Sequence, residues 1–507
     1  MISYLPNSLW KRSRAVRYHS TRSKDHYYEP SEAILKGLCE DGGLFVADGL
    51  EAEKLGLSHI CHMDYMDEAY EVMRHFLTDM SEEELKGAIG RAYEGRFSSR
   101  LVTPLTELGR DWLLELYHGP TSAFKDVALC MLPQLMSIAL RGRDERLMIV
   151  TATSGDTGKA ALEGFRDAEH IGITVFYPDH KVSDIQYLQM ATQEGSNTFV
   201  GAVRGNFDDC QTEVKRIFSS DIAGRLVERN IWLSSANSIN IGRLIPQIVY
   251  YVDAWRQLFM KGEIGPEDAV DFCVPTGNFG DVLAGYLAKL MGLPVGRLIV
   301  ASNENKVLTD FLTTGVYDRR RDFVKTISPS MDILVSSNLE RLLYYESGGD
   351  CELVAGLMKD LSEKGVFRVP DELLSGIRES FECGFATDEE AKAYIKQAYE
   401  DFDRILDPHT AVAYKVASDY ISSHGRLRPM IVLSTASPYK FASDVLSSLT
   451  GEEKSGFEAM DRLYELTREP VPSALAGLRD KRILHDRVLD REQMKDFVYE
   501  NAGRMKS

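Results

Sequence analysis

The sequence predicts an α/β fold with mostly parallel sheets and helices on both of their faces. Short apolar runs alternate with segments of helical periodicity from about residue 147 onward, which is typical of strand–helix–strand units. The chain has 507 residues, of which 44% are hydrophobic and 27% charged, so it can build several ordinary domains. In parallel sheets, ligands bind beyond the carboxyl ends of the strands, so we searched the loops that follow strands.

Composition excludes several classes of function. The formal net charge of −18 argues against a nucleic-acid partner or an anionic membrane, and any anionic substrate needs a local site. The seven cysteines include no C-x-x-C pair, which indicates free thiols in the cytoplasm and no metal site. The longest apolar stretch, Val127–Leu140, is too short to span a bilayer. The basic segment Met1–Lys24 predicts a flexible start.

The N-terminal part is expected to form a domain that closes near Arg100. Ser31–Leu38 predicts a capped helix, with Ala33, Ile34 and Leu38 on one face, and residues 44–47 predict a strand. Tyr65–Tyr93 is helical by periodicity and contains a capping box at Ser81 and Glu84.

Strands and helices then alternate. We expect strands at residues 147–150, 173–176, 231–233, 270–274, 298–301 and 431–433. We expect helices at residues 159–167, 184–192, 208–229, 241–258 and 282–291. Residues 352–400 are acidic and helical, and helices are also predicted after Thr450.

Leu114–Met131 predicts a short strand, a Gly-Pro turn and a helix capped by Thr121 or Ser122. Lys125 then lies in the first helical turn, where the helix dipole and apolar neighbours favour its neutral amine. A neutral lysine can form a Schiff base with a carbonyl compound. The alternative is a solvated lysine on an ordinary amphipathic helix.

Two further loops follow predicted strands. In the loop Pro275–Asp281, Gly277 and Gly280 let several N–H groups point at one anion, which predicts a phosphate site, while Asp281 is expected to cap the next helix. A plain tight turn explains this loop equally well. The loop Thr153–Gly158 offers hydroxyl and N–H groups that suit a carboxylate, and it departs from a Walker A loop at Thr153 and Ala160.

Asn237–Arg243 brings two amides, a hydroxyl and a guanidinium together, which predicts a second phosphate site or else a capped helix start. The hydroxyls of Ser434–Ser437 suit a ring nitrogen or an ordinary turn. We expect His118 to pack rather than react. Asp407–Thr410 could line the site, but a turn before a helix explains these residues equally well.

Together these stretches resemble the threonine synthase family, whose members are fold-type II pyridoxal-phosphate enzymes related in fold to tryptophan synthase β. The resemblance starts near Arg17, leaving Met1–Val16 outside it, and GLCEDGGLFV is similar to the N-terminal domain of the longer branch. It rests on the stretches HGPTSAFKD, TSGDTG, NSIN with Arg243, PTGNFGD, SNEN at 302–305, SPSMDI at 328–333 and LSTASPYKF at 433–441. It implies an N-terminal domain at 1–100, a large cofactor-binding domain at 101–150 and 240–450, a smaller substrate-side domain at 151–239 and a helical tail at 451–507.

The resemblance also implies roles for individual residues. Lys125 would bond pyridoxal 5'-phosphate as a Schiff base. The cofactor phosphate would be held by Gly277, Asn278, Phe279, Gly280 and Asp281, the pyridine nitrogen by Thr435 or Ser437, and the ring oxygen would face Asp156, where relatives often carry Asn. The substrate carboxylate would meet Ser154, Gly155 and Thr157, and the substrate phosphate Asn237, Ser238, Asn240 and Arg243. No metal is implied.

The implied reaction converts O-phospho-L-homoserine and water into L-threonine and phosphate, the last step of threonine biosynthesis, in a cytoplasmic monomer or weak dimer. One alternative is a phosphohomoserine lyase that gives 2-oxobutyrate, ammonia and phosphate. A serine or threonine dehydratase needs no second phosphate site, so Arg243 speaks against it. A non-catalytic metabolite-binding protein is the alternative from another class, and it would tolerate loss of Lys125.

Overall fold

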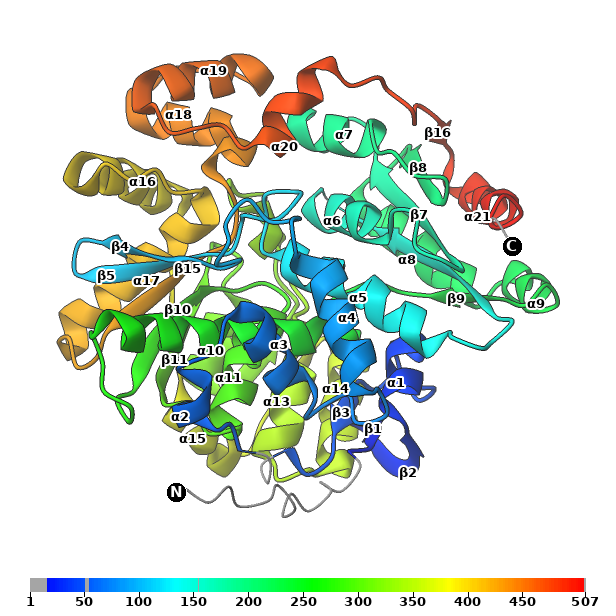
Figure 1. Cartoon of the computed structure of the whole chain (residues 1–507), viewed down its shortest axis with the longest axis horizontal. Coiled ribbons are helices and arrows are strands. Elements are labelled where there is room, and N and C mark those ends of the chain that lie inside the picture. The colour runs from blue at the N-terminus through cyan, green and yellow to red at the C-terminus, as the bar shows by residue number, and fades with distance from the viewer. Residues whose placement is uncertain (1–15, 51–53, 154, 506–507) are drawn as a thin grey trace, which may run out of the picture.

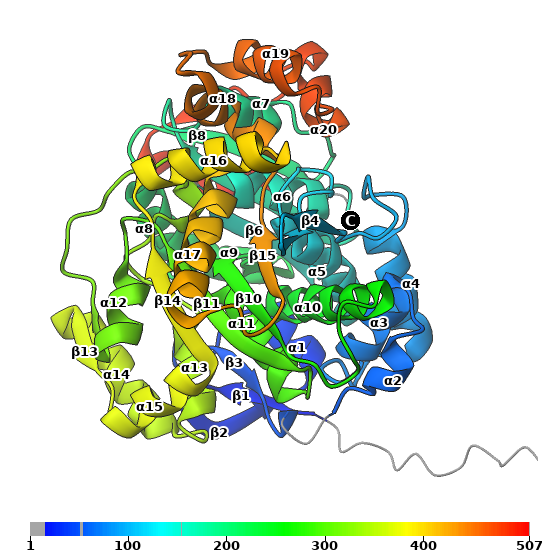
Figure 2. The ribbon, with the colours of Figure 1, turned by 90° about the vertical axis from the view of Figure 1, so that its left-hand side faces the viewer.

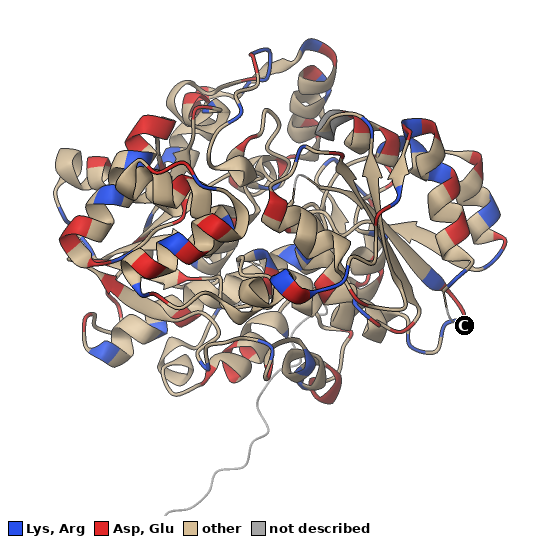
Figure 3. Ribbon diagram, turned by 90° about the horizontal axis from the view of Figure 1, so that it is seen from above, with Lys and Arg blue, Asp and Glu red and all other residues tan. Residues whose placement is uncertain are grey.

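The computed structural model describes residues 16–50, 54–153 and 155–505. Most of the basic segment Met1–Lys24 and the expected carboxylate ligand Ser154 lie outside the described residues. The protein has two main β-sheets, each covered by helices. The larger sheet lies on the left of Figure 1 and the smaller one on its right. Acidic and basic residues are interspersed over the helices (Figure 3).

The larger sheet has six strands in the order β14-β11-β10-β15-β5-β4, all parallel except for the antiparallel pair β4 and β5. Alternate residues of a strand face opposite sides of the sheet. Phe272 and Val274 accordingly pack in one hydrophobic cluster and Cys273 in another. The strands are β4 Leu105–Leu108, β5 Asp111–Glu115, β10 Val270–Pro275, β11 Val295–Ser302, β14 Phe381–Phe385 and β15 Met430–Ser434.

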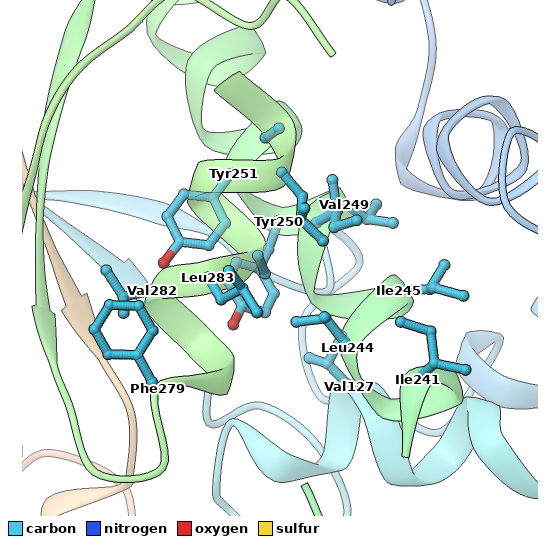
Figure 4. Packing of buried hydrophobic residues seen from close by; sticks show 14 of the residues in the cluster. Val127, Ile241, Leu244, Ile245, Val249, Tyr250, Tyr251, Phe279, Val282 and Leu283 are labelled. Carbon is cyan, nitrogen blue, oxygen red and sulfur yellow. The ribbon is translucent and has the colours of Figure 1, made fainter. Parts of the chain in front are cut away.

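Helices cover both faces of this sheet. One face packs against α10 Ile241–Lys261 and α11 Gly280–Leu290, and the other against α16 Asp388–Phe402 and α17 Pro408–His424 (Figure 2). Figure 4 shows the buried side chains of Leu244 and Tyr250 of α10 beside Leu283 of α11.

The smaller sheet has five parallel strands in the order β16-β8-β7-β6-β9. These are β6 Arg146–Ala152, β7 Ile171–Pro178, β8 Thr198–Val203, β9 Ile231–Ser234 and β16 Val488–Leu489. One face packs on α5 Lys125–Ala139 and α6 Asp156–Phe165, and the other on α8 Phe207–Phe218, α9 Asp221–Val227 and α21 Met494–Ala502. The expected α/β fold with mostly parallel sheets is thereby confirmed, while the domain limits stay a prediction.

The N-terminal part forms a small antiparallel sheet, in the order β2-β1-β3, and four helices that pack on the large core. The expected capping box is confirmed, because Ser81 Oγ accepts from Glu84 N and the Glu84 carboxylate accepts from Ser81 N. The elements are β1 Tyr18–Ser20, β2 Ser23–Tyr28, α1 Pro30–Lys36, β3 Phe45–Ala47, α2 Leu57–Ile60, α3 Tyr65–Met73 and α4 Glu82–Tyr93.

The remaining elements surround the two main sheets. Between β11 and β14 lie α12 Val307–Thr314, β12 Val316–Asp318, the 3-10 turn η2 Pro329–Met331, α13 Leu339–Glu346, α14 Cys351–Lys364, β13 Val366–Arg368 and α15 Asp371–Ser380. After β7 comes α7 Asp184–Ala191. After β15 come η3 Pro438–Phe441, α18 Ala442–Thr450, α19 Gly456–Thr467, α20 Ser473–Ala476, η4 Gly477–Asp480 and η5 Arg491–Gln493.

Several expected elements are wrong in detail. The single helix at residues 208–229 is two helices, because Ser220 lies outside the helical region and its hydroxyl donates to the carbonyl of Ile217, the next-to-last residue of α8. Residues 65–93 likewise hold two helices, and residues 352–400 include β13 and β14. The strand β8 was not expected, and the predicted helical tail contains β16. Helix α1 ends before Leu38, which is exposed.

None of the helices in the described residues is both long and apolar enough to cross a membrane.

Candidate active site

A cavity of about 830 Å³ opens where strands of both sheets end. Ala152 at the end of β6, Pro275 at the end of β10 and Thr435 after β15 all line it, as expected for parallel sheets. The sequence-predicted residues that line it are Lys125, Asp156, Thr157, Asn237, Ser238, Arg243, Gly277, Asn278, Phe279, Gly280, Asp281 and Thr435. Gly155, Asn240 and Ser437 do not line it.

Lys125 is the first residue of α5 and is only 8% exposed. The expected cap by Thr121 or Ser122 is wrong. Thr121 donates from both its backbone N and its hydroxyl to the Asp126 carboxylate, at 2.8 and 2.6 Å, which fixes the turn instead. Burial lowers the pKa of Lys125 to about 8, and the Lys440 and Arg243 charges act in the same direction, while Asp156 opposes them. This amine is therefore neutral far more often than that of an exposed lysine.

The loop after β10 presents a row of backbone donors. Phe279 has a positive φ of 62°, which turns the chain into α11 at Gly280. The N–H groups of Gly277 to Asp281 have no acceptor among the described residues. A Cβ at Gly277 would lie 2.7 Å from the carbonyl oxygen of Ser330, so a side chain has no room there. Free N–H groups at a helix N-terminus suit a phosphate, so the loop fits the phosphate of pyridoxal 5'-phosphate.

Asp281 does not cap α11, contrary to expectation. Its carboxylate points into the protein, where Oδ1 accepts hydrogen bonds from the hydroxyls of Tyr250 and Tyr251, two side chains of α10 (Figure 4). Burial raises the pKa of Asp281 to about 6, although the two hydroxyls act against that rise. Only the backbone of Asp281 is left to face an anion.

Asp156 is the first residue of α6 and pairs with a lysine that the sequence analysis had not singled out. Its Oδ1 lies 2.8 Å from Lys440 Nζ and accepts from Gln186 Nε2 at 3.1 Å. Burial acts to raise the pKa of Asp156, but the charges of Lys440 and Lys125 outweigh it and hold that pKa well below its usual range. Asp156 is therefore ionised, and a ring oxygen placed beside it must supply the proton of any hydrogen bond.

The residues of the segment Asn237–Arg243 have two roles: Asn240 caps α10, whereas Asn237, Ser238 and Arg243 line the cavity. Asn240 caps α10, where Oδ1 accepts from Gly242 N at 2.9 Å and Nδ2 donates to Ile34 O at 3.0 Å. Arg243 is 4% exposed and donates from Nη1 to Ala236 O at 3.0 Å, while its Nε has no partner among the described residues. Burial lowers the pKa of Arg243 to about 10. A buried guanidinium with a free N–H beside a cavity suits an anionic ligand.

The two hydroxyls after β15 differ. Thr435 lines the cavity, and its carbonyl accepts from Phe124 N at 2.8 Å, which ties this strand end to the start of α5. Ser437 caps η3 by accepting from Tyr439 N at 3.3 Å. Of these two, Thr435 is placed to meet a ligand.

Two cavity residues were missed or left undecided in the sequence. Lys125 Nζ donates to Ser330 Oγ at 3.4 Å, and Ser330 N donates to His409 Nε2 at 3.1 Å. Asp407 caps α17 and also accepts from His409 Nδ1 at 2.7 Å, so both interpretations of that segment hold. The motif SPSMDI at 328–333 contains Ser330 and was the sequence signal for it. The motif alone does not predict that Ser330 contacts Lys125.

The motifs SNEN at 302–305 and SPSMDI at 328–333 are joined by hydrogen bonds that hold the segment containing Ser330 in place. Asn303 and Asn305 both donate to Asp332 Oδ1, at 2.8 and 2.9 Å. His118 instead bonds Glu115 at 2.8 Å and does not line the cavity. Within residues 16–50, 54–153 and 155–505, no cluster of three or more His, Cys, Asp or Glu side chains could hold a metal ion.

Comparison with known proteins gives consistent matches. Residues 17–93 match a family model described as threonine synthase N terminus, and residues 410–498 match one described as threonine synthase, C-terminal. Threonine synthase of Pseudomonas aeruginosa is 40% identical over 440 residues, covering 86% of this chain and 91% of that protein. Threonine synthase-like 1 of Homo sapiens is 40% identical over 437 residues, or 83% of this chain, which spans only 58% of that longer relative.

Solved structures agree. The PLP-bound threonine synthase from Brucella melitensis has a TM-score of 0.86 at 36% identity, with 96% of this chain and 99% of that chain covered. Threonine synthase from yeast has a TM-score of 0.86 at 34% identity with the same coverage.

Proposed function

This chain belongs to the threonine synthase family, and on that premise we propose that it converts O-phospho-L-homoserine and water into L-threonine and phosphate. It would act as a carbon–oxygen lyase on a phosphate ester, with pyridoxal 5'-phosphate as cofactor. The observation that carries the proposal is Arg243, a buried cation that lines the same cavity as Lys125 and the donor loop Gly277–Asp281 and whose Nε–H has no partner among the described residues. Two anion sites beside one amine suit a cofactor phosphate and a substrate phosphate.

The cofactor would be held by four sets of groups. Lys125 would bond its aldehyde, the N–H groups of Gly277–Asp281 would hold its phosphate, Thr435 would meet its pyridine nitrogen and Asp156 would face its ring oxygen. Pyridoxal phosphate, when bound, accepts the electron pair that a substrate carbon keeps after losing a proton. The lining of the cavity supports each of these places.

The substrate would lie between the loop at Gly155–Thr157 and the start of α10. Thr157 and nearby N–H groups take its carboxylate, while Arg243, Asn237 and Ser238 take its phosphate. Asn237 is oriented by Thr151, whose hydroxyl donates to Asn237 Oδ1 at 2.9 Å. Asn240 acts on this site only by capping α10.

Lys125 carries the proton transfers. With the substrate bound, its neutral amine would remove the proton from the substrate's α-carbon. The β-carbon then loses a proton and the phosphate leaves the γ-carbon, where Arg243 stabilises the growing negative charge. The γ-carbon then regains a proton, water adds its hydroxyl at the β-carbon, and a proton returned to the α-carbon completes L-threonine.

We also propose that the chain works in the cytoplasm as a monomer or weak dimer, without nucleic-acid or membrane partners. The net charge of −18 supports the absence of a polyanionic partner, and the seven free thiols support a reducing compartment.

The test adds O-phospho-L-homoserine to purified protein loaded with pyridoxal phosphate and measures phosphate and threonine together. Equal amounts of the two products support the proposal. Release of phosphate with 2-oxobutyrate and ammonia, and without threonine, would assign the lyase reaction instead. Protein that binds no pyridoxal phosphate would contradict the proposal altogether.

A further inference from the structure

A second buried lysine, Lys440, pairs with Asp156. Lys440 belongs to η3, which follows the last strand of the six-stranded sheet, whereas Asp156 starts a helix of the five-stranded sheet. The Lys440 side chain is 0% exposed and that of Asp156 is 4% exposed, and their charged atoms are 2.8 Å apart. The Lys440 amine also donates to Thr121 O at 3.0 Å. The pair therefore joins a segment of the six-stranded sheet to a segment of the five-stranded sheet, and Asp156 lines the cavity.

Burying an ion pair costs several kcal/mol of desolvation, so such a pair is weak evidence for a role in stability alone. Lys440 does not line the cavity, whereas its partner does. Lys440 therefore acts on a ligand only through the carboxylate that it binds.

The hydroxyl of Ser330 links the Asp156 carboxylate to the Lys125 amine. Asp156 Oδ2 accepts from Ser330 Oγ at 3.5 Å, and Ser330 Oγ in turn accepts from Lys125 Nζ at 3.4 Å. Lys440 and Lys125 are the two cations that act on the Asp156 carboxylate. Removing Lys440 would leave Lys125 as the cation available to this buried anion, and a protonated Lys125 is the form that satisfies it.

Four charged groups act on the Lys125 amine. Asp156 and Asp281 favour its protonated form, whereas Lys440 and Arg243 favour its neutral form. His409 faces it only indirectly, through the backbone N–H of Ser330. Of the two cations, Lys440 alone binds one of the two carboxylates.

We propose that Lys440 is a positioning residue for the reaction, which occupies the Asp156 carboxylate so that the Lys125 amine remains available in its neutral form. The inference rests on the proposed function, because it concerns the amine that bonds the cofactor.

The test follows the bonding of pyridoxal phosphate to the full-length chain after its cofactor has been removed. The rate of the rise in visible absorbance is measured across pH, and the midpoint of that profile is compared between variants. Lys440→Met should raise the midpoint by about one pH unit or more, and Asp156→Asn should lower it. The double variant should return toward the wild-type midpoint, and Lys440→Arg, which keeps the charge, should stay near it.

An unchanged midpoint in Lys440→Met would overturn the inference, and so would a raised midpoint that the added Asp156→Asn change does not reverse. Circular dichroism checks that each variant is folded. If Lys440→Met does not fold, Asp156→Asn decides alone, and a midpoint at or above that of the wild type overturns the inference. Failure of the proposed function looks different, since the wild-type chain would then form no threonine from O-phospho-L-homoserine, or would bond no pyridoxal phosphate at any pH.

Discussion

The backbone N–H of Ser330 donates a hydrogen bond of 3.1 Å to Nε2 of His409, whose Nδ1 is held by Asp407 at 2.7 Å. This bond requires His409 to be neutral, with its proton on Nδ1, because a protonated ring has no acceptor to offer. His409 thus positions Ser330, whose hydroxyl accepts from Lys125, and acts on the amine only through that residue.

His409→Ala should lower kcat roughly 10- to 100-fold, because the half-buried Ser330 N–H loses its acceptor at a cost of about 1–3 kcal/mol. Hydrogen exchange at residues 326–332 should speed up in the same variant. His118→Ala is the matched control, since His118 bonds Glu115 outside the cavity. Equal kinetics in the two variants would contradict a role for His409.

Lys125→Ala should abolish the visible absorbance of bound cofactor. It should also lower turnover by at least about 10²–10⁴-fold, the usual contribution of a positioned proton carrier. Absorbance spectra and a threonine assay measure the two effects. Lys415→Ala, which removes a lysine paired with Asp419 at 2.8 Å, serves as the control and should keep both signals. Sustained threonine formation by Lys125→Ala would disprove the assignment.

Arg243→Met should raise KM for O-phospho-L-homoserine by roughly 10- to 100-fold, since hydrogen bonds to a charged group contribute about 1.5–3 kcal/mol. Cofactor content should not change, because the cofactor phosphate is assigned to Gly277–Asp281. Steady-state kinetics and cofactor release by alkali measure the two quantities. Arg204→Ala removes an exposed arginine and should leave KM unaltered. Loss of the cofactor from Arg243→Met would mean that the two phosphate sites have been exchanged.

Asp281 should make the cofactor-free protein less stable as the pH rises. Burial raises the pKa of Asp281 to about 6, above its ordinary value of 3.8, so the folded state holds the proton more tightly than the unfolded state. Stability from this group is fully present below pH 4 and is lost between about pH 4 and 6, by about 3 kcal/mol. Asp281→Asn removes that dependence. Urea unfolding of both proteins at pH 4 and pH 7 measures the difference, and parallel pH profiles would refute it.

The sequence by itself determined the fold class and the loops that line the cavity. Parallel strands of one sheet end at the same edge, so the polar segments that follow β10 and β15 were expected to lie close together, and Lys125 and Gly277 were found from local residue types. That the segment after β6, in the other sheet, lines the same cavity did not follow from the sequence. The split of residues 208–229 into two helices and the strand β8 were missed, because tertiary packing overrides weak local periodicity.

Only the tertiary structure decided which polar side chain binds which. Asn240 and Arg243 look equally suited to a phosphate in the sequence, yet the fold places Ile34 O against Asn240 and leaves Arg243 Nε unpaired beside the cavity. Lys440 follows a strand of the six-stranded sheet and Asp156 a strand of the five-stranded sheet, while Ser330 and Lys125 are 205 residues apart in the chain. Such pairs depend on how close two distant segments lie after folding. Burial then makes each pairing matter more, because a charge removed from water is costly unless a partner lies within reach.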